Sequence, residues 1–296
     1  MKHLLSIEGL DVSEINQILI RALEFEKGKR SANHPNAHIV NMFFENSTRT
    51  KMSFEMAANK IHAQKYDFCA GNSSINKGED IYDTVNNLSA IGANIIVMRH
   101  ENNILVSKLS KMQYFGDISF VNAGSGTATH PTQALLDYYT MKQRFVDMVG
   151  RIVVFVGDVA HSRVAKSNIS LLKKFGAKIR CLCPEYFKGN EIQGVEYFSD
   201  IKLAFKDADV VMALRIQRER IEEKVDLRDY IEKYQINSSN LPQNAFLMHP
   251  GPVNKGIEIS SELFNTNCTN TFLKQAHNGV FIRMAVLDML LGQWGL

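Results

Sequence analysis

Residues 47–50 read Ser-Thr-Arg-Thr and stand between a short apolar run and a stretch with helical periodicity. A helix that begins here presents free backbone N–H groups at the positive end of its dipole. With hydroxyl groups and one guanidinium beside those N–H groups, the segment is typical of a phosphate-binding site. The same residues also suit plain helix capping by Ser47, with Arg49 in solvent. A P-loop is not supported, because the chain contains no GxxxxGK[ST] sequence.

Two further cationic positions and one histidine lie in the first half of the chain. Lys77 stands in the polar loop 72–80, either as a point charge for an anion or as a solvated surface lysine. Arg99 directly follows an apolar strand, at the carboxyl edge where parallel sheets bind ligands. His130 precedes a proline suited to the first position of a helix, which places Gln133 in the first turn. The helix dipole there favours a neutral imidazole that donates one N–H to a carbonyl oxygen, although a simple capping histidine fits the same sequence.

The second half repeats the pattern of polar side chains after strands. Arg163 opens a predicted helix after the strand 152–156, a position suited to binding a carboxylate. Arg215 and Gln217 are two residues apart at a strand end and therefore point to one side, unless this arginine-rich segment is a solvated helix face. Residues 249–252 read His-Pro-Gly-Pro, a stiff turn that either offers backbone carbonyls to a bound amine or acts as a structural corner.

These cations gather after strands in a chain that is nearly neutral. Lys and Arg number 34 and Asp and Glu 31, which gives a net charge of +3. Cations concentrated at strand ends favour a small, multiply anionic set of substrates. The sequence shows no acid pair, metal-ligand cluster or Ser–His–Asp arrangement beside them. We therefore expect a transfer reaction driven by positioning and electrostatic stabilisation, without a protein nucleophile, a metal or a cofactor.

Eight short β-branched runs alternate with helix-length amphipathic stretches, the pattern of parallel sheets built from βαβ units. The predicted strands are 39–44, 65–69, 95–98, 119–121, 152–156, 179–182, 210–214 and 246–248. A long helical stretch at 131–144 separates two groups of four strands. The predicted fold class is therefore α/β, with two doubly wound domains, each holding a parallel four-to-five-stranded sheet, joined by helices. A single eight-stranded barrel is the alternative, and a last apolar helix at 280–291 suits either domain.

Length and composition limit the class of protein. A chain of 296 residues suits two domains of about 150 residues. The small net charge gives no indication of a nucleic-acid partner. Four cysteines without a CxxC pair indicate a reducing compartment rather than a disulfide framework. The first residues lack the apolar stretch of a signal peptide, and the longest apolar run is too short to cross a bilayer, so we expect a cytoplasmic protein without a membrane partner.

Four motifs in this order resemble the signatures of the aspartate/ornithine carbamoyltransferase family. They are Ser-Thr-Arg-Thr at 47–50, His-Pro-Thr-Gln at 130–133, Arg-x-Gln at 215–217 and His-Pro-Gly-Pro at 249–252. The similarity runs from the first strand to the C-terminal helix and is greatest to catalytic chains of the aspartate branch, which serves pyrimidine synthesis. It implies a carbamoyl-phosphate-binding domain over 1–145 plus 276–296 and an aspartate-binding domain over 146–275. It also implies a homotrimer whose active sites are shared between neighbouring subunits.

The resemblance also assigns roles to individual residues. It implies carbamoyl-phosphate binding by Ser47, Thr48, Arg49, Thr50, Arg99, His130, Gln133, Pro250 and Gly251. It implies aspartate binding by Lys77, Arg163, Arg215 and Gln217, with Ser73 and Lys77 supplied by the adjacent subunit. The catalytic set is then Arg49, Thr50, Lys77, Arg99 and His130. The sequence departs from some relatives at 74–76 in the Ser73 loop and at Gly251, which replaces a larger apolar residue.

Two other functions stay open. Ornithine carbamoyltransferases share the first substrate, but they place Cys-Leu-Pro after the late histidine, where this chain has Pro-Gly-Pro after His249. Arg163 and Arg215 also offer two cations, which suits an acceptor with two carboxylates. A catalytically inactive anion-binding or regulatory subunit is expected to lack residues of the chemical step, whereas all of the catalytic positions named above are present. Carbamoyl phosphate and L-aspartate are the expected substrates, and a regulatory chain or a pathway enzyme stays open as a further partner.

Overall fold

The computed structural model describes residues 1–69, 71, 73–217 and 227–293, and the chain divides into two compact units. Unit 1 comprises Met1–Leu136 and Ala276–Leu296, and unit 2 is the continuous stretch Asp137–Gln275. The chain therefore passes from one unit to the other twice. The sequence placed these passages at 145–146 and 275–276. The first lies instead inside the long helix α5 (Pro131–Lys142), at 136–137.

Unit 1 is built on a parallel four-stranded sheet of order β2-β1-β3-β4. Its strands are β1 (His38–Phe43), β2 (Gln64–Phe68), β3 (Ile95–His100) and β4 (Ser119–Ser125). The helices before and between them are α1 (Val12–Glu26), α2 (Thr48–Lys60), α3 (Ile81–Ala90) and α4 (Leu105–Leu109). Most residues of β1, β3 and β4 are buried, which explains their continuous apolar character, whereas β2 is an exposed edge strand.

The C-terminal helix α10 (Thr269–Gly292) returns the chain to unit 1. Its Asp288 is nearly buried and accepts hydrogen bonds from Arg21 of α1 and from His34, each at 2.8 Å between the paired atoms. A buried carboxylate requires such partners, so this cluster fixes the end of α10 against the first helix of the chain. The apolar pattern of residues 280–291 suits either domain, and in the structure this stretch belongs to unit 1.

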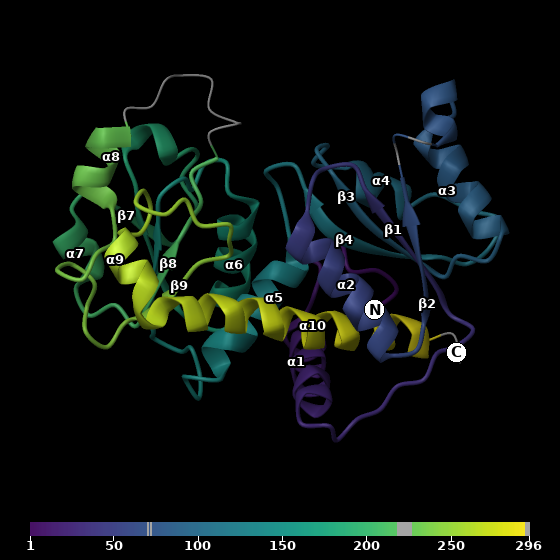
Figure 1. The fold of residues 1–296 in the computed structure, drawn as a ribbon, viewed down its shortest axis with the longest axis horizontal. Coiled ribbons are helices and arrows are strands. Elements are labelled where there is room, and N and C mark those ends of the chain that lie inside the picture. The colour runs from purple at the N-terminus through teal and green to yellow at the C-terminus, as the bar shows by residue number, and fades with distance from the viewer. Residues whose placement is uncertain (70, 72, 218–226, 294–296) are drawn as a thin grey trace. The chain divides into compact units, whose positions relative to one another are not determined.

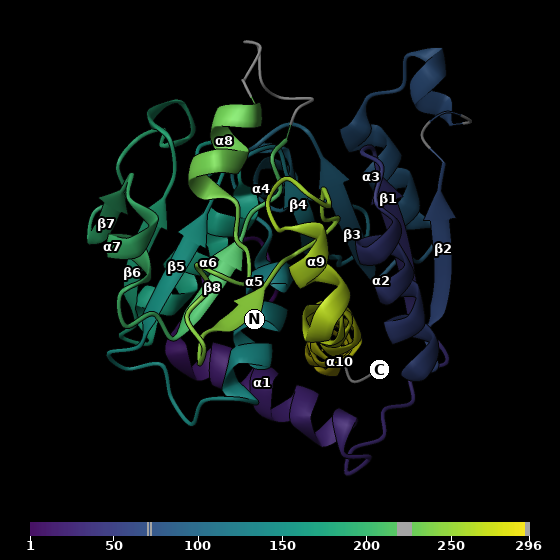
Figure 2. The same ribbon diagram turned by 60° about the vertical axis from the view of Figure 1, so that its left-hand side comes forward.

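Unit 2 is built on a parallel five-stranded sheet of order β7-β6-β5-β8-β9, whose strands lie side by side in Figure 2. The strands are β5 (Ile152–Val156), β6 (Lys178–Leu182), β7 (Val195–Phe198), β8 (Val210–Ala213) and β9 (Phe246–Met248). Its helices are the second part of α5, then α6 (Arg163–Lys174), α7 (Ile201–Phe205), α8 (Leu227–Tyr234) and α9 (Ser261–Leu263). Cys181 lies in β6 and Cys183 directly after it, and both are buried, as expected for a strand.

The predicted α/β class with two parallel sheets is confirmed, and the single barrel is wrong. All eight predicted strands are present; β5 and β9 have the predicted bounds, and the ends of the others differ by a few residues. The sequence reading missed β7, because this edge strand is only partly buried and carries no continuous apolar run. Among the described residues, no helix combines the length and the apolar character that crossing a membrane requires.

The two passages between the units are joined by a hydrogen bond within unit 2. Gln275 Nε2 donates to Asp137 Oδ1 at 2.8 Å, and Asn168 Nδ2 donates to Asp137 Oδ2 at 2.9 Å. All three side chains are buried. The first and the last residue of unit 2 therefore lie within hydrogen-bond reach of each other.

Candidate active site

The segment 47–50 lies where the sequence predicted, between the end of β1 and the first turn of α2. Ser47 occupies the N-cap position, but its side chain makes no capping hydrogen bond, so the expectation of side-chain capping is wrong. Thr48 and Arg49 are exposed in the first turn, and Thr50 is buried. The segment therefore lies at the positive end of a 13-residue helix, an arrangement that suits an anion.

Arg99 lies inside β3 rather than after it, at the carboxyl end of the strand. β1 and β3 are parallel neighbours with Phe43 opposite Arg99, so the ends of both strands are adjacent. Arg99 Nε donates to Glu45 Oε2 at 3.1 Å, and Arg99 Nη1 donates to Ser47 Oγ at 3.4 Å. The guanidinium is therefore held beside the N-terminus of α2. The sequence analysis did not single out Glu45, although an acidic residue two positions before the Ser-Thr-Arg-Thr motif was a visible signal.

His130 directly precedes α5 and is almost fully buried, with 3 % of its surface exposed. Its Nε2 lies 3.5 Å from Thr50 Oγ1, within hydrogen-bond reach. Gln133 follows in the first turn of α5 and is also buried. The structure thus links Ser47 to Arg99 and Thr50 to His130, and all four lie at the carboxyl edge of one sheet. The predicted carbamoyl-phosphate residues of unit 1 come together here.

A tight turn connects the end of β4 to His130. Gly126 has a φ of +41°, a left-handed conformation that favours glycine. Its N–H donates to the His100 carbonyl at 2.9 Å, and the next N–H, from Thr127, donates to Asn103 Oδ1 at 2.9 Å. The glycine thereby allows the His130 loop to approach the backbone that follows Arg99.

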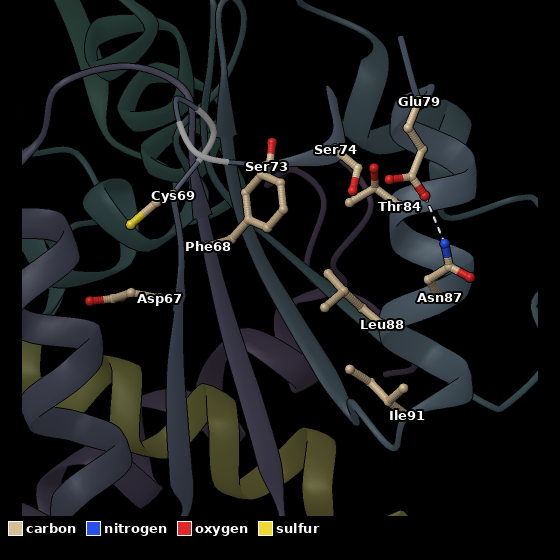
Figure 3. A pocket seen from close by; sticks show the side chains of 10 residues that line it. All are labelled: Asp67, Phe68, Cys69, Ser73, Ser74, Glu79, Thr84, Asn87, Leu88 and Ile91. Carbon is tan, nitrogen blue, oxygen red and sulfur yellow. Dashed lines mark hydrogen bonds between the residues drawn. The ribbon is translucent and has the colours of Figure 1, made fainter. Parts of the chain in front are cut away.

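Ser73 and Lys77 lie in and beside the exposed 3-10 turn Ser74–Lys77. Ser73 lines a surface pocket of about 510 Å³ between β2 and α3, together with Phe68, Leu88 and Ile91 (Figure 3). Lys77 is exposed and does not line it.

In unit 2, Arg163 begins α6 as predicted, after the N-cap Ser162, whose Oγ accepts from Ala165 N at 3.1 Å. Arg163 is 7 % exposed, which fits a guanidinium held for a carboxylate better than a solvated one. The turn before it is ordered by the buried Asp158, which accepts from the N–H and from Nδ1 of His161 at 3.1 and 2.9 Å. The sequence reading did not single out Asp158.

Arg215 and Gln217 follow β8, with the buried Ile216 between them. The alternation of half-buried and buried residues places both side chains on one side, as the sequence predicted. Gln217 Nε2 donates to the His161 carbonyl at 2.8 Å, which ties this segment to the turn before Arg163. The neighbouring positions 218 and 220, also arginines in the sequence, lie outside the described residues.

The turn after β9 holds Pro250 and Gly251, both half-buried. Gly251 N donates to His249 Nδ1 at 2.7 Å, and His249 N donates to Gln275 Oε1 at 3.0 Å. Hydrogen bonds from within unit 2 therefore order this turn. The second predicted cluster, Arg163, Arg215, Gln217 and the 250–251 turn, lies at the strand ends of one sheet.

Chemically, unit 1 offers hydroxyl, imidazole and guanidinium donors beside a helix N-terminus, and unit 2 offers guanidinium and amide donors beside a turn. Such donors bind anions and stabilise negative charge that develops on oxygen. In residues 1–69, 71, 73–217 and 227–293, no group of three or more His, Cys, Asp or Glu side chains is arranged to hold a metal ion.

Comparisons with known proteins match both halves of the chain. Residues 2–143 match the family "Aspartate/ornithine carbamoyltransferase, carbamoyl-P binding domain", and residues 149–290 match "Aspartate/ornithine carbamoyltransferase, Asp/Orn binding domain". The aspartate carbamoyltransferase catalytic subunit of Malacoplasma penetrans is 38 % identical over 300 residues, covering 99 % of this chain and 97 % of that protein. The catalytic subunit of Oceanobacillus iheyensis aspartate carbamoyltransferase is 40 % identical, with coverages of 100 % and 95 %.

Solved structures of similar proteins share the fold. The catalytic subunit of M. jannaschii aspartate transcarbamoylase superposes with a TM-score of 0.87 at 28 % identity, covering 99 % of both chains. The ornithine carbamoyltransferase of Gloeobacter violaceus superposes with a TM-score of 0.84 at 23 % identity, also over 99 % of both chains, and this likeness concerns the fold alone.

Proposed function

Because the chain belongs to the aspartate/ornithine carbamoyltransferase family, we propose that it transfers the carbamoyl group of carbamoyl phosphate to the amine of L-aspartate. The products are N-carbamoyl-L-aspartate and phosphate, as in pyrimidine synthesis. The observation that carries the proposal is the cluster in unit 1, where Thr50 contacts His130 and Arg99 contacts Ser47 at adjacent strand ends. The 38–40 % identity to aspartate carbamoyltransferase catalytic subunits favours L-aspartate over ornithine as the acceptor.

The first substrate binds in unit 1. The N-terminus of α2, with Ser47, Thr48 and Arg49, receives the phosphate group. Thr50, Arg99 and His130 donate to the carbamoyl oxygen, and Gln133 completes the carbamoyl-phosphate site. The carbonyls of Pro250 and Gly251 face the attacking amine. Support comes from the position of residues 47–50 at the N-terminus of α2 and from the burial of Thr50 and His130, which keeps water from competing for the donors.

The acceptor binds through unit 2. Arg163 and Arg215 pair with the two carboxylates of L-aspartate, and Gln217 adds an amide donor. Two guanidinium groups match two carboxylates in both charge and planar geometry. An acceptor with a single carboxylate leaves one of these cations without its partner.

The reaction needs no covalent intermediate on the enzyme. The uncharged amine attacks the carbamoyl carbon, the new C–N bond forms, and the bond from that carbon to the phosphate oxygen breaks. A phosphate oxygen takes the proton that the amine loses. Negative charge develops on the carbamoyl oxygen and on the leaving phosphate, and loss of one donor to such an oxygen costs ~2.7–4 kcal/mol of transition-state stabilisation.

The proposal includes a cytoplasmic homotrimer in which Ser73 and Lys77 serve the neighbouring subunit's site, where Lys77 also contacts L-aspartate. Support comes from the exposed position of Lys77, in a turn where none of the residues is buried. A regulatory chain or a pathway enzyme stays open as a further partner of this trimer. No cofactor takes part.

The test is an assay of purified protein with carbamoyl phosphate and either L-aspartate or L-ornithine, with the product identified by mass spectrometry. We expect N-carbamoyl-L-aspartate, and no citrulline. Arg49→Ala, at the start of α2, should abolish the activity, whereas Lys60→Ala, at the exposed end of the same helix, should leave it unchanged. Citrulline alone contradicts the acceptor assignment, and no product from either amino acid indicates a binding subunit instead of an enzyme.

A further inference from the structure

The segment with Arg215 and Gln217 owes its backbone position to a carboxylate far along the chain. Between these two residues, the N–H of Ile216 donates to Glu258 Oε1 at 2.9 Å. The carbonyl of Ile216 accepts from Asn254 Nδ2 at 3.4 Å. Both backbone polar groups of Ile216 are therefore held by two side chains from the turn that follows β9. Because Ile216 is fully buried, neither group can exchange these partners for water.

Glu258 also orders the turn from which it comes. Its Oε2 accepts from the N–H of Asn254 at 2.8 Å, and its Oε1 accepts from Asn254 Nδ2 at 2.6 Å. Asn254 lies three residues after Gly251, whose own N–H is bound to His249 Nδ1. One carboxylate thus joins the strand end that carries Arg215 and Gln217 to the turn that carries Pro250 and Gly251.

Glu258 is almost fully buried, with 1 % of its surface exposed. Burial raises the pKa of Glu258, while the hydrogen bonds from Ile216 and Asn254 act in the opposite direction. A buried carboxylate is costly unless donors surround it, so its three N–H partners are part of its stability. An apolar side chain would avoid the cost of burying a charge, but it would not join the segment with Arg215 and Gln217 to the turn with Pro250 and Gly251.

We infer that Glu258 is a positioning residue for the acceptor, which acts through the backbone of Ile216 and through Asn254 without touching the substrate. This inference rests on the proposed function, because it takes Arg215 and Gln217 as ligands of L-aspartate. Fixing Ile216 fixes the direction in which the two neighbouring side chains leave the backbone. A displacement of about 1 Å at such a position is enough to weaken catalysis strongly.

The central variant is Glu258→Gln, which keeps the size of the side chain but turns one acceptor oxygen into an NH₂ group. That group faces an N–H donor in either orientation. At the Oε2 position it removes the hydrogen bond from Asn254 N, and at the Oε1 position it removes those from Ile216 N and Asn254 Nδ2. We expect the KM for L-aspartate to rise about 10- to 100-fold, the range for one charge-assisted hydrogen bond. The affinity for carbamoyl phosphate, measured by calorimetry, should stay unchanged, since its principal ligands lie in unit 1.

Two further variants keep the test decisive. Asn254→Ala removes the side chain that bridges Glu258 and the Ile216 carbonyl. It should raise the KM for L-aspartate by a smaller factor than Glu258→Gln does. The double variant should have a KM for L-aspartate close to that of Glu258→Gln alone, because both changes break the same group of hydrogen bonds around Ile216. The matched control is Glu262→Gln, the same chemical change at an exposed glutamate of α9, which should alter neither KM nor Tm.

Each outcome separates a positioning role from a structural one. A lower Tm of Glu258→Gln with an unchanged KM for L-aspartate overturns the inference, as does an equal loss of affinity for both substrates. If Glu258→Gln does not fold, Asn254→Ala decides by the same criteria. If wild-type protein forms no product, the proposed function fails, and calorimetric titration with L-aspartate still tests Glu258. Weaker binding by Glu258→Gln then supports the inference, and equal or absent binding in wild type and variant overturns it.

Discussion

Gly126 offers a sharp test of how the His130 loop is positioned. Its φ of +41° is strained for any residue with a Cβ atom, at a cost of roughly 1–2 kcal/mol. A Cβ atom added here would also overlap the Glu101 carbonyl oxygen and Asn103 Oδ1. Backbone cannot yield as a flexible side chain does, so overpacking adds about 1–3 kcal/mol. Gly126→Ala should therefore destabilise the protein by about 2–5 kcal/mol in total.

Gly28→Ala is the matched control for this prediction. Gly28 also belongs to unit 1 and has a φ of +64°, but nothing lies within 4 Å of the added Cβ atom. This variant carries the conformational strain without the overlap. The difference between the two variants should be about 1–3 kcal/mol, or about 2–12 °C in Tm for a chain of this size. Urea denaturation and calorimetry measure it directly.

The activity of Gly126→Ala should fall as well, because the turn that must shift leads to His130. We expect kcat to fall by about tenfold or more, toward the loss that follows removal of one oxyanion donor. Gly28→Ala should keep the wild-type kcat. Equal Tm values for the two variants, or a wild-type kcat for Gly126→Ala, would refute the account of this turn.

Three further experiments test individual contacts. Glu45→Gln weakens the hold on Arg99, and steady-state kinetics should show kcat reduced about tenfold with Tm nearly unchanged, since partly exposed ion pairs add little stability. Arg215→Ala should lose ~1.5–3 kcal/mol of L-aspartate binding while carbamoyl-phosphate binding persists, and Arg49→Ala should show the reverse in the same calorimetric titrations. Inactive Arg49→Ala and Lys77→Ala proteins, unfolded together and refolded as a mixture, should regain activity approaching one native site per mixed trimer. A verified hybrid without activity would contradict the shared site.

Much of the fold follows from local patterns in the sequence. Strands such as β5 and β9 are short runs of apolar residues only, and their bounds were predicted to the residue. β7 was missed because Val195–Phe198 at the sheet edge is only partly buried, so its position depends on pairing with β6 rather than on its own composition. The division between the units lies inside α5, at 136–137, and a continuous helix carries no sequence signal of such a boundary.

The candidate site was predicted less completely. Arg99 and His130 were found because basic side chains after apolar strands stand out in the sequence. Glu45, Asp158 and Glu258 were not, since each acts through a partner that is distant in the chain or through backbone N–H groups. Hydrogen bonds such as the one from Ile216 to Glu258, 42 residues apart, depend on the tertiary structure and leave no local pattern.

The hydrogen bond between Asp137 and Gln275 bears on the order in which the chain folds. Residues 276–296 must return to unit 1 after a long excursion, because unit 2 runs from Asp137 to Gln275. Closing an unfolded loop of this length costs about 4 kcal/mol of chain entropy on a logarithmic length scale. Once unit 2 has folded, its two ends are already adjacent, and most of that cost no longer opposes the docking of α10. Substitutions that slow the folding of unit 2 should therefore also delay completion of unit 1, although they lie outside it.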